Sequence, residues 1–196
     1  MGKLVCLLGK SSTGKDTLYN LLLADRELAL KPLVLYTTRP ARAGEEDGRE
    51  YRFVTEEQLL AFERLFGAIE RRLYHTAHGP WAYCTLKDGQ MSGGDRICIT
   101  APMAIEGYFD AFGAENIFPV YLQTDDSLRL RRAIKREEMQ HNPSFSEVCR
   151  RYLADDEDFS EEKLALCRIA KRYDNRDLKA CFEAVKRDIA GFLHTE

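Results

Sequence analysis

The stretch that decides the fold of this chain is Leu4-Val5-Cys6-Leu7-Leu8-Gly9-Lys10-Ser11-Ser12-Thr13-Gly14-Lys15-Asp16-Thr17. Its first five residues form a continuous apolar run, which is typical of a strand buried on both faces. A glycine-bounded loop follows, and then a helical pattern with leucine at positions 18, 21, 22 and 23. A buried strand that leads through a tight loop into a helix predicts the first unit of a parallel α/β sheet.

Short apolar strands alternate with helical segments along the rest of the chain. We expect strands at 33–36, 97–100 and 117–122, and helices at 55–65, 102–112, 127–140, 146–157, 160–167 and 176–193. Residues 37–83 interrupt this alternation, because they are polar at first and then mix β-type residues with turn formers. The pattern therefore predicts one α/β domain with a parallel, doubly wound sheet and a lobe inserted into it.

Composition and charge exclude several classes of protein. The chain has 196 residues, of which 44% are hydrophobic and 31% charged, and such values exclude a mainly disordered or collagen-like chain. Its apolar runs are far shorter than the ~18–20 residues of a membrane span. The net charge is −3, so phosphate binding requires a local basic cluster. No stripe of aromatic and basic residues accompanies the arginines, so we expect neither a membrane nor a nucleic-acid partner.

The cysteines indicate a reducing compartment. None of them has the two-residue spacing of a zinc or redox site, and we expect all of them to be buried, reduced thiols. After Met1-Gly2-Lys3 the chain lacks the cleavage region of a signal peptide, which predicts a cytoplasmic protein. The cysteines are Cys6, Cys84, Cys98, Cys149, Cys167 and Cys181.

The loop after the first strand has the spacing of a phosphate-binding loop: glycine, four residues, glycine and lysine. The glycines allow backbone N–H groups to turn inward around phosphate oxygens at the positive end of the following helix. Lys15 can then reach the β- and γ-phosphates, and we expect ATP there. The predicted ATP-binding residues of this segment are Gly9, Lys10, Ser11, Ser12, Thr13, Gly14, Lys15, Asp16 and Thr17.

Asp16 stands where a hydroxyl normally binds Mg²⁺, and Thr17 is one residue too late to replace it. A carboxylate is an equally hard oxygen ligand, so we predict that Asp16 holds Mg²⁺ directly or through water. The alternative is an acidic residue that only interacts favourably with the helix dipole.

A second motif runs from Thr37 to Val54 and reads TTRPARAGEEDGREYRFV. Arg39 and Arg42 lie three residues apart in an irregular loop, so their guanidinium groups can converge on one phosphate dianion. Tyr51 can donate its hydroxyl to the same phosphate. The segment resembles the acceptor-binding segment of guanylate kinases, T-T-R-x-x-R-x-G-E-x-x-G-x-x-Y-x-F.

With both motifs in this order, the chain resembles the guanylate kinase family from Leu4 to about Leu193. The resemblance implies a P-loop three-layer fold and the reaction of ATP and GMP to ADP and GDP with Mg²⁺, carried out by a monomer or a homodimer. It further implies a core of 1–36, 86–125 and 168–196, an acceptor-binding lobe at 37–85 and a helical lid at 126–167. The acceptor-binding residues it implies are Thr37, Arg39, Arg42, Glu45, Tyr51, Glu70, Tyr83 and Thr85.

The resemblance also assigns roles to basic residues in the second half of the chain. Arg132, Arg136 and Arg151 match the lid arginines, which close over the triphosphate and neutralise the transferring group. Together with Lys15 and Arg39 they are the predicted catalytic residues. Asn175 lies where the family places an adenine contact.

Two departures from the family pattern keep other functions open. The aspartate-rich D-x-D-x-Q-G segment is missing after the third core strand, and Leu35 stands where the family offers a hydroxyl to guanine. One alternative is a kinase for another small phosphorylated acceptor such as a ribose phosphate, since the G-K-D loop also resembles ribose 1,5-bisphosphate phosphokinases. The other is a catalytically weak guanylate kinase-like binding module, against which the intact phosphate loop argues.

Overall fold

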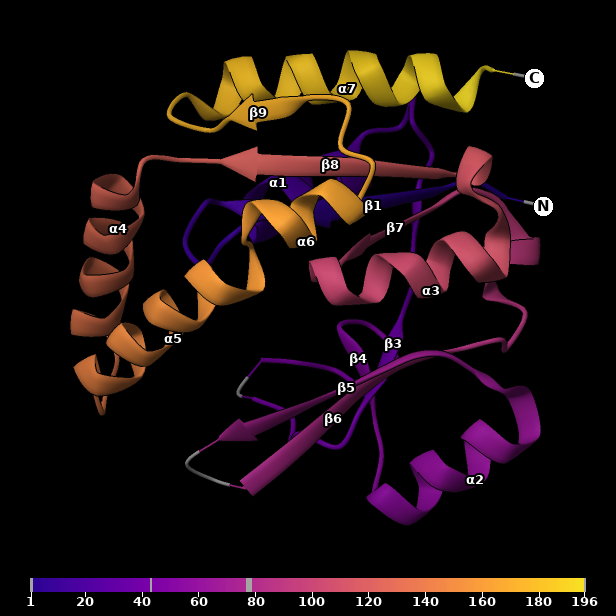
Figure 1. The fold of residues 1–196 in the computed structure, drawn as a ribbon, viewed down its shortest axis with the longest axis horizontal. Coiled ribbons are helices and arrows are strands. Elements are labelled where there is room, and N and C mark those ends of the chain that lie inside the picture. The colour runs from indigo at the N-terminus through magenta and orange to yellow at the C-terminus, as the bar shows by residue number, and fades with distance from the viewer. Residues whose placement is uncertain (1, 43, 77–78, 196) are drawn as a thin grey trace.

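The computed structural model describes residues 2–42, 44–76 and 79–195 and shows two β-sheets with helices packed around them (Figure 1). One sheet has five strands in the order β2-β7-β1-β8-β9, and the other has four strands in the order β4-β3-β6-β5. The larger sheet is parallel throughout. The prediction of an α/β fold with a parallel sheet is therefore confirmed.

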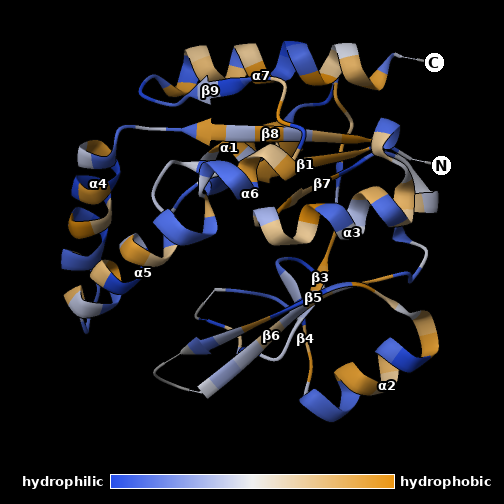
Figure 2. Cartoon of the chain, viewed as in Figure 1, coloured by the Kyte–Doolittle hydropathy of each residue, from blue (hydrophilic) through white to orange (hydrophobic). Residues whose placement is uncertain are grey.

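The parallel sheet forms the core of the molecule. Its strands are β1 (Leu4–Leu8), β2 (Lys31–Pro32), β7 (Arg96–Ile99), β8 (Ile117–Gln123) and β9 (Arg172–Asp174). Helices α1 (Lys15–Ala24) and α7 (Leu178–Leu193) pack on one face, and α3 (Pro102–Phe112) and α6 (Glu161–Leu166) on the other. Because β1 lies between two strands and two helical layers, all five of its residues are buried. Figure 2 shows the largely apolar character of its neighbour β8 and the hydrophilic character of the edge strand β9.

The second sheet lies beside the core and carries its own helix. Its strands are β3 (Leu35–Thr37), β4 (Tyr51–Phe53), β5 (Ala68–Thr76) and β6 (Gly79–Leu86), and α2 (Glu56–Phe66) packs against them. Helix α2 begins at the Thr55–Gln58 capping box and ends at Gly67, whose φ of 81° is a left-handed conformation that suits glycine. The predicted start of this helix at Thr55 is thus confirmed.

The strand predicted at 33–36 is wrong as a single element. Lys31–Pro32 pairs with β7 in the core sheet, whereas Leu35–Thr37 pairs with β4 and β6 in the second sheet. Between them, the Leu33 N–H donates to the Ile97 carbonyl at 2.9 Å, and the side chain of Gln90 bonds the backbone of Val34 at 2.9 and 3.0 Å. The apolar run indicates burial correctly, but the chain passes from one sheet to the other inside it.

Two helices, α4 (Asp126–Glu138) and α5 (Phe145–Asp158), project from the carboxyl end of the core sheet and pack on each other (Figure 1). Short 3₁₀ turns at Gln90–Gly93 and Ala114–Asn116 complete the described elements. All six thiols are unpaired, but Cys149 on α5 is exposed. The expectation that it is buried was wrong, because α5 packs through one face only. Among the residues described, no helix has the length and apolarity to cross a membrane.

Candidate functional site

The predicted phosphate loop lies at the carboxyl end of β1 and leads into α1. The Thr13 side chain donates to the Lys10 carbonyl at 2.8 Å, which closes the loop on itself. Gly14 has a φ of 94°, and a Cβ there would lie 2.4 Å from Nδ2 of Asn175. The same Nδ2 donates to the Thr13 carbonyl at 2.7 Å. Asn175 is buried, so the structure places it beneath the loop as a support.

Lys15 spans this loop, with its Nζ donating to the Lys10 carbonyl at 3.1 Å. Burial lowers the pKa of Lys15, although the carboxylates of Asp16 and Asp155 act in the opposite direction. A half-buried ammonium group without a paired carboxylate in contact needs further negative charge nearby. The phosphates of a nucleotide would supply it.

Asp16 and Thr17 lie in the first turn of α1 and are both exposed. Among the described residues, no side chain forms an ion pair or hydrogen bond with Asp16, and no group of three or more His, Cys, Asp and Glu gathers to hold a metal ion. A divalent cation next to Asp16 would therefore take most of its ligands from phosphate oxygens and water, which is how Mg²⁺ is commonly bound.

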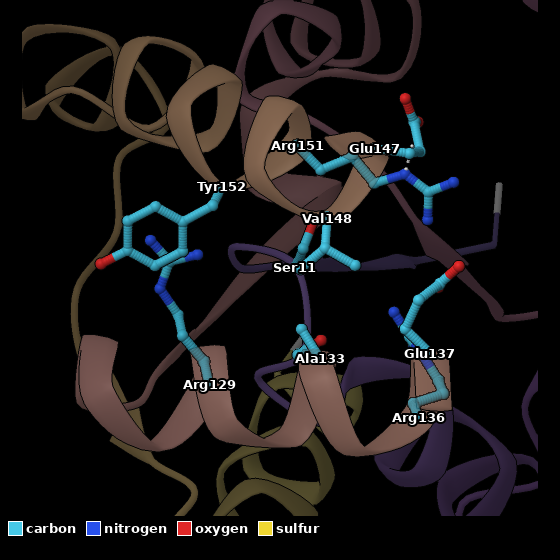
Figure 3. A pocket seen from close by; sticks show the side chains of 10 residues that line it. Ser11, Arg129, Ala133, Arg136, Glu137, Glu147, Val148, Arg151 and Tyr152 are labelled. Atoms are coloured by element: carbon cyan, nitrogen blue, oxygen red, sulfur yellow. Dashed lines mark hydrogen bonds and ion pairs between the residues drawn. The ribbon is translucent and has the colours of Figure 1, made fainter. Parts of the chain in front are cut away.

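Helices α4 and α5 close over the phosphate loop (Figure 3). The cavity between them has a volume of about 20 Å³, enough for a single water molecule. Its lining includes Ser11 and Ser12 of the phosphate loop and the predicted lid residues Arg136 and Arg151. A triphosphate does not fit into this space.

Arg132, Arg150 and Arg151 have protein partners. Arg132 donates to the Asn175 carbonyl at 3.2 Å, which joins α4 to the support of the phosphate loop. Arg150 and Arg151 both bond to Glu147, and these contacts, Arg150 first, lower the pKa of Glu147 to about 2. The three predicted lid arginines thus lie around the loop, and Arg151 is held by an acidic residue of its own helix.

Asp155 of α5 occupies the mouth of the phosphate loop. Its carboxylate accepts from the Ser11 N–H at 2.8 Å and from the Ser11 hydroxyl at 3.1 Å. Arg129, only 1% exposed, donates to the same carboxylate at 2.9 Å, and its guanidinium lies 4.1 Å from the centre of the Tyr152 ring. Next to this pair, Lys10 bonds Asp156 at 2.6 Å. The Ser11 N–H, which could donate to a phosphate, thus donates to the Asp155 carboxylate.

Arg39 of the second motif is buried and bonds Glu45 through two nitrogens, each at 2.9 Å. Glu45 also accepts from the backbone N–H of Arg42 at 2.7 Å, and its pKa is lowered chiefly by Arg39. The Arg42 side chain is exposed. The two guanidinium groups predicted to converge are therefore arranged differently: Arg39 is held by Glu45, and Arg42 contributes its backbone. Thr37 is buried and donates to the Ala82 carbonyl at 2.9 Å, which ties β3 to β6.

A row of tyrosines extends from Arg39 along the second sheet. The Arg39 guanidinium lies 5.4 Å from the Tyr51 ring centre, and Tyr51 packs edge-on against Tyr83 at 5.5 Å. Tyr83 packs in the same way against Tyr74 at 5.6 Å. Burial raises the pKa of Tyr51, and Tyr83 acts in the same direction. The predicted acceptor residues Arg39, Tyr51 and Tyr83 are thus packed together on the second sheet.

Glu70 and Thr85 lie directly opposite each other on β5 and β6, and the Thr85 hydroxyl donates to Glu70 at 2.8 Å. The same hydroxyl contacts the Tyr108 hydroxyl of α3 at 2.9 Å. Glu70 also forms an ion pair with Arg72 at 2.8 Å. Glu70 is buried.

Four residues of this site were not predicted from the sequence: Arg72, Tyr108, Arg129 as a buried ion-pair partner, and Asp155. Arg72 could have been found from the sequence, because residues two apart on a strand share a face and Arg72 is two residues from the predicted Glu70. Asp155 had none, because it meets Ser11 across 144 positions of sequence.

Comparisons with known proteins agree with this geometry. A sequence model of the family "Guanylate kinase" matches residues 1–74, which include the phosphate loop and the second motif. A guanylate kinase of Porphyromonas gingivalis is 29% identical over 202 aligned positions, covering 98% of this chain and 99% of the relative. A guanylate kinase of Schizosaccharomyces pombe is 48% identical over 57 residues, which are 29% of this chain and 28% of the relative.

The fold is shared with a solved structure as well. The crystal structure of guanylate kinase from Anaplasma phagocytophilum superposes with a TM-score of 0.67 at 17% identity, covering 99% of this chain and 87% of that one. The match to the Porphyromonas gingivalis relative extends over residues 126–167 as well, whereas the family model matches only the part that holds the two motifs. In sequence and in fold, the chain is thus similar to guanylate kinases over nearly its full length.

Proposed function

We propose that this chain transfers the γ-phosphoryl group of ATP to the phosphate of GMP, releasing ADP and GDP. The observation that carries the proposal is that the chain holds both a phosphate loop between β1 and α1 and a packed Arg39–Tyr51–Tyr83 group, and is similar to guanylate kinases over 98% of its length. Direct transfer between two phosphates requires two anion sites in line, and no residue has to form a covalent intermediate.

In the proposed ATP site, the backbone of the phosphate loop and Lys15 bind the β- and γ-phosphates. Arg132, Arg136 and Arg151 approach from the lid and neutralise charge on the transferring group once the lid has closed over ATP. Arg151 then exchanges Glu147 for a phosphate. Asn175 fixes the Thr13 carbonyl and Gly14, and so shapes the loop.

Mg²⁺ fits this site through Asp16, whose exposed carboxylate is free of protein partners among the described residues. When bound, the ion would neutralise charge on the phosphates of ATP. Asp16 then has the task of orienting it at the first turn of α1.

In the proposed acceptor site, Arg39, Arg42, Tyr51 and Tyr83 bind the phosphate of GMP, and Glu45 holds Arg39 in place. Glu70 and Thr85 lie at the other end of the tyrosine row, where the guanine base would reach. Thr37 acts through the β3–β6 contact rather than through the substrate. We also propose the division into a core, an acceptor-binding lobe at 37–85 and a lid at 126–167, and a cytoplasmic location, where ATP is available and unpaired thiols stay reduced.

A coupled ADP-release assay tests the proposal with GMP, dGMP, AMP, UMP, CMP and ribose phosphates as acceptors. We expect the highest kcat/KM with a guanine nucleotide. Lys15→Ala should abolish turnover with every acceptor, and the variant's circular dichroism should match that of the wild type. Near-full turnover of Lys15→Ala, or a ribose phosphate as the best acceptor, would contradict the proposal.

A further inference from the structure

Glu70 and Arg72 form a closed ion pair inside the proposed acceptor site. Their side chains are 6% and 10% exposed, and both point to the same side of β5 because they are two residues apart. One carboxylate oxygen accepts from Arg72 Nε at 2.8 Å. The other accepts from Arg72 Nη2 at 3.3 Å and from the Thr85 hydroxyl at 2.8 Å. Both oxygens of Glu70 are therefore engaged before any acceptor binds.

Glu70 has little room to turn away from this pair. Helix α3 presses against β5 at Gly107, where a Cβ would lie 2.5 Å from the Ile69 carbonyl and 3.3 Å from the Cβ of Glu70. Tyr108, the next residue of α3, is fully buried and holds Thr85 from the other side. The pair is thus fixed by the backbone of two elements, and breaking it would leave a buried charge without a partner, which is strongly unfavourable.

The Glu70–Arg72 ion pair affects how the site can recognise a purine base. Guanine offers two adjacent donors, N1–H and the N2 amino group, and a carboxylate with two free oxygens would accept from both. Arg72 competes with these donors for Glu70. In return, its guanidinium offers donors to carbonyl oxygens and ring nitrogens, such as O6 and N7 of guanine. Hypoxanthine has the same O6 and N1–H but lacks the N2 amino group, and adenine has an amino group in place of O6.

We propose that Arg72 is a specificity-determining residue of the acceptor site. By holding Glu70 it removes most of the discrimination based on the N2 amino group, so that the site recognises 6-oxopurine nucleoside monophosphates as a class and accepts IMP nearly as well as GMP. This inference rests on the proposed function, since it concerns the base end of the same acceptor site.

The test compares GMP with IMP in the wild type, Arg72→Met and Arg72→Gln. For each protein, kcat/KM is measured by ADP release, and Kd is measured by calorimetry without ATP. In the wild type we expect the two nucleotides to differ by less than about threefold in both measurements. Either substitution frees Glu70, so the preference for GMP over IMP should rise at least tenfold, and the preference for GMP over AMP should not rise in parallel.

Arg71→Met is the matched control. Arg71 is the neighbour of Arg72 on β5, but it pairs with Glu56 and Glu63 of α2 instead. It should leave the GMP-to-IMP ratio unchanged. If Arg72→Met does not fold, as judged by circular dichroism, Arg72→Gln decides, since it keeps a polar group at this position.

Several outcomes would overturn the inference. A wild-type preference for GMP over IMP above about thirtyfold would do so without any variant. So would a ratio in both Arg72 variants within twofold of the wild type. If no nucleoside monophosphate is phosphorylated, the proposed function fails, but the ratio of the two dissociation constants still tests the role of Arg72.

Discussion

The carboxylate of Asp155 accepts a hydrogen bond of 2.8 Å from the backbone N–H of Ser11. This contact joins the lid helix α5 to the phosphate loop, and the buried Arg129 binds the same carboxylate from the other side. A phosphate group needs the same kind of donor. In the proposed ATP site, a phosphate would therefore compete with Asp155 for the Ser11 N–H, and the strength of that competition can be measured.

Asp155→Asn should tighten ATP binding. The amide oxygen can still accept from Ser11, but the negative charge next to the entering phosphates is gone. We expect Kd for ATP to fall by up to about tenfold, which corresponds to ~1.4 kcal/mol. The free protein should unfold at a lower temperature, because Arg129 loses an ionised partner. Calorimetric titration with ATP and a thermal melt measure the two effects.

Asp156→Asn serves as the control for this variant. Asp156 carries the same charge on the same turn and contacts Lys10, but it is half exposed. If both substitutions tighten ATP binding equally, the effect comes from the overall charge of α5, and the specific competition at Ser11 is disproved.

Lys15→Met should abolish phosphoryl transfer and yet stabilise the free protein. Burial lowers the pKa of Lys15 in the folded state, so at neutral pH the charged form is less favourable there than in the unfolded chain. Between the lowered pKa and the ordinary value of about 10.5, the unfolded chain binds more protons, and stability from this group rises with pH. Urea unfolding between pH 7 and 10 should show this gain in the wild type and not in Lys15→Met. A lower stability of Lys15→Met at pH 7 would contradict the argument.

Arg42→Ala should weaken acceptor binding without changing stability. The side chain is exposed, and only its backbone N–H contacts Glu45. Losing one charge-assisted bond to a phosphate costs ~1.5–3 kcal/mol, so KM for GMP should rise roughly 10- to 100-fold. Arg39→Ala should weaken acceptor binding similarly and also lower the free energy of unfolding, by ~1–3 kcal/mol, because Glu45 loses its main partner. Kd for ATP should stay the same in both variants, and an equal loss of ATP affinity would place this loop on the wrong substrate.

Asp16→Ser should keep more activity than Asp16→Ala if the carboxylate orients Mg²⁺. Serine restores an oxygen ligand, whereas alanine offers none. The Mg²⁺ concentration at half-maximal rate should rise in the order wild type, serine, alanine, and ATP binding in metal-free buffer should change little. If Asp16 only interacts with the helix dipole, worth ~0.3–1 kcal/mol, the two variants should give identical Mg²⁺ titrations.

Features that depend on neighbouring residues could be predicted from the sequence. The buried strand Leu4–Leu8, the loop that follows it and the start of α2 at Thr55 all follow from local patterns, and the structure has them at these positions. An apolar run such as 33–36, however, indicates burial without saying in which sheet. The chain changes sheets there because Lys31–Pro32 pairs with β7 and Leu35–Thr37 pairs with β6. The paired residues lie 65 positions further on in β7 and 46 to 48 positions further on in β6.

The site shows the same limit. The phosphate loop and the Arg39–Tyr51 segment are local in sequence, so their residues could be identified without the fold. The residues that form hydrogen bonds and ion pairs with these groups could not all be identified in this way. Glu45 lies near Arg39, but the contact between Ser11 and Asp155 depends on how two helices of the lid pack on the core. Long-range contacts of this kind follow from tertiary packing, which a single sequence does not reveal.

The central position of β1 has a consequence for the order of folding. Its hydrogen-bonding partners, β7 and β8, are formed by residues 96–99 and 117–123. During synthesis Leu4–Leu8 leaves the ribosome before either partner, and the first partner becomes available only with residues 96–99 and the second with residues 117–123. The apolar strand stays unpaired until residues 96–99 are made, which makes shorter fragments prone to aggregate. The central strand of the core is thus made early and paired late.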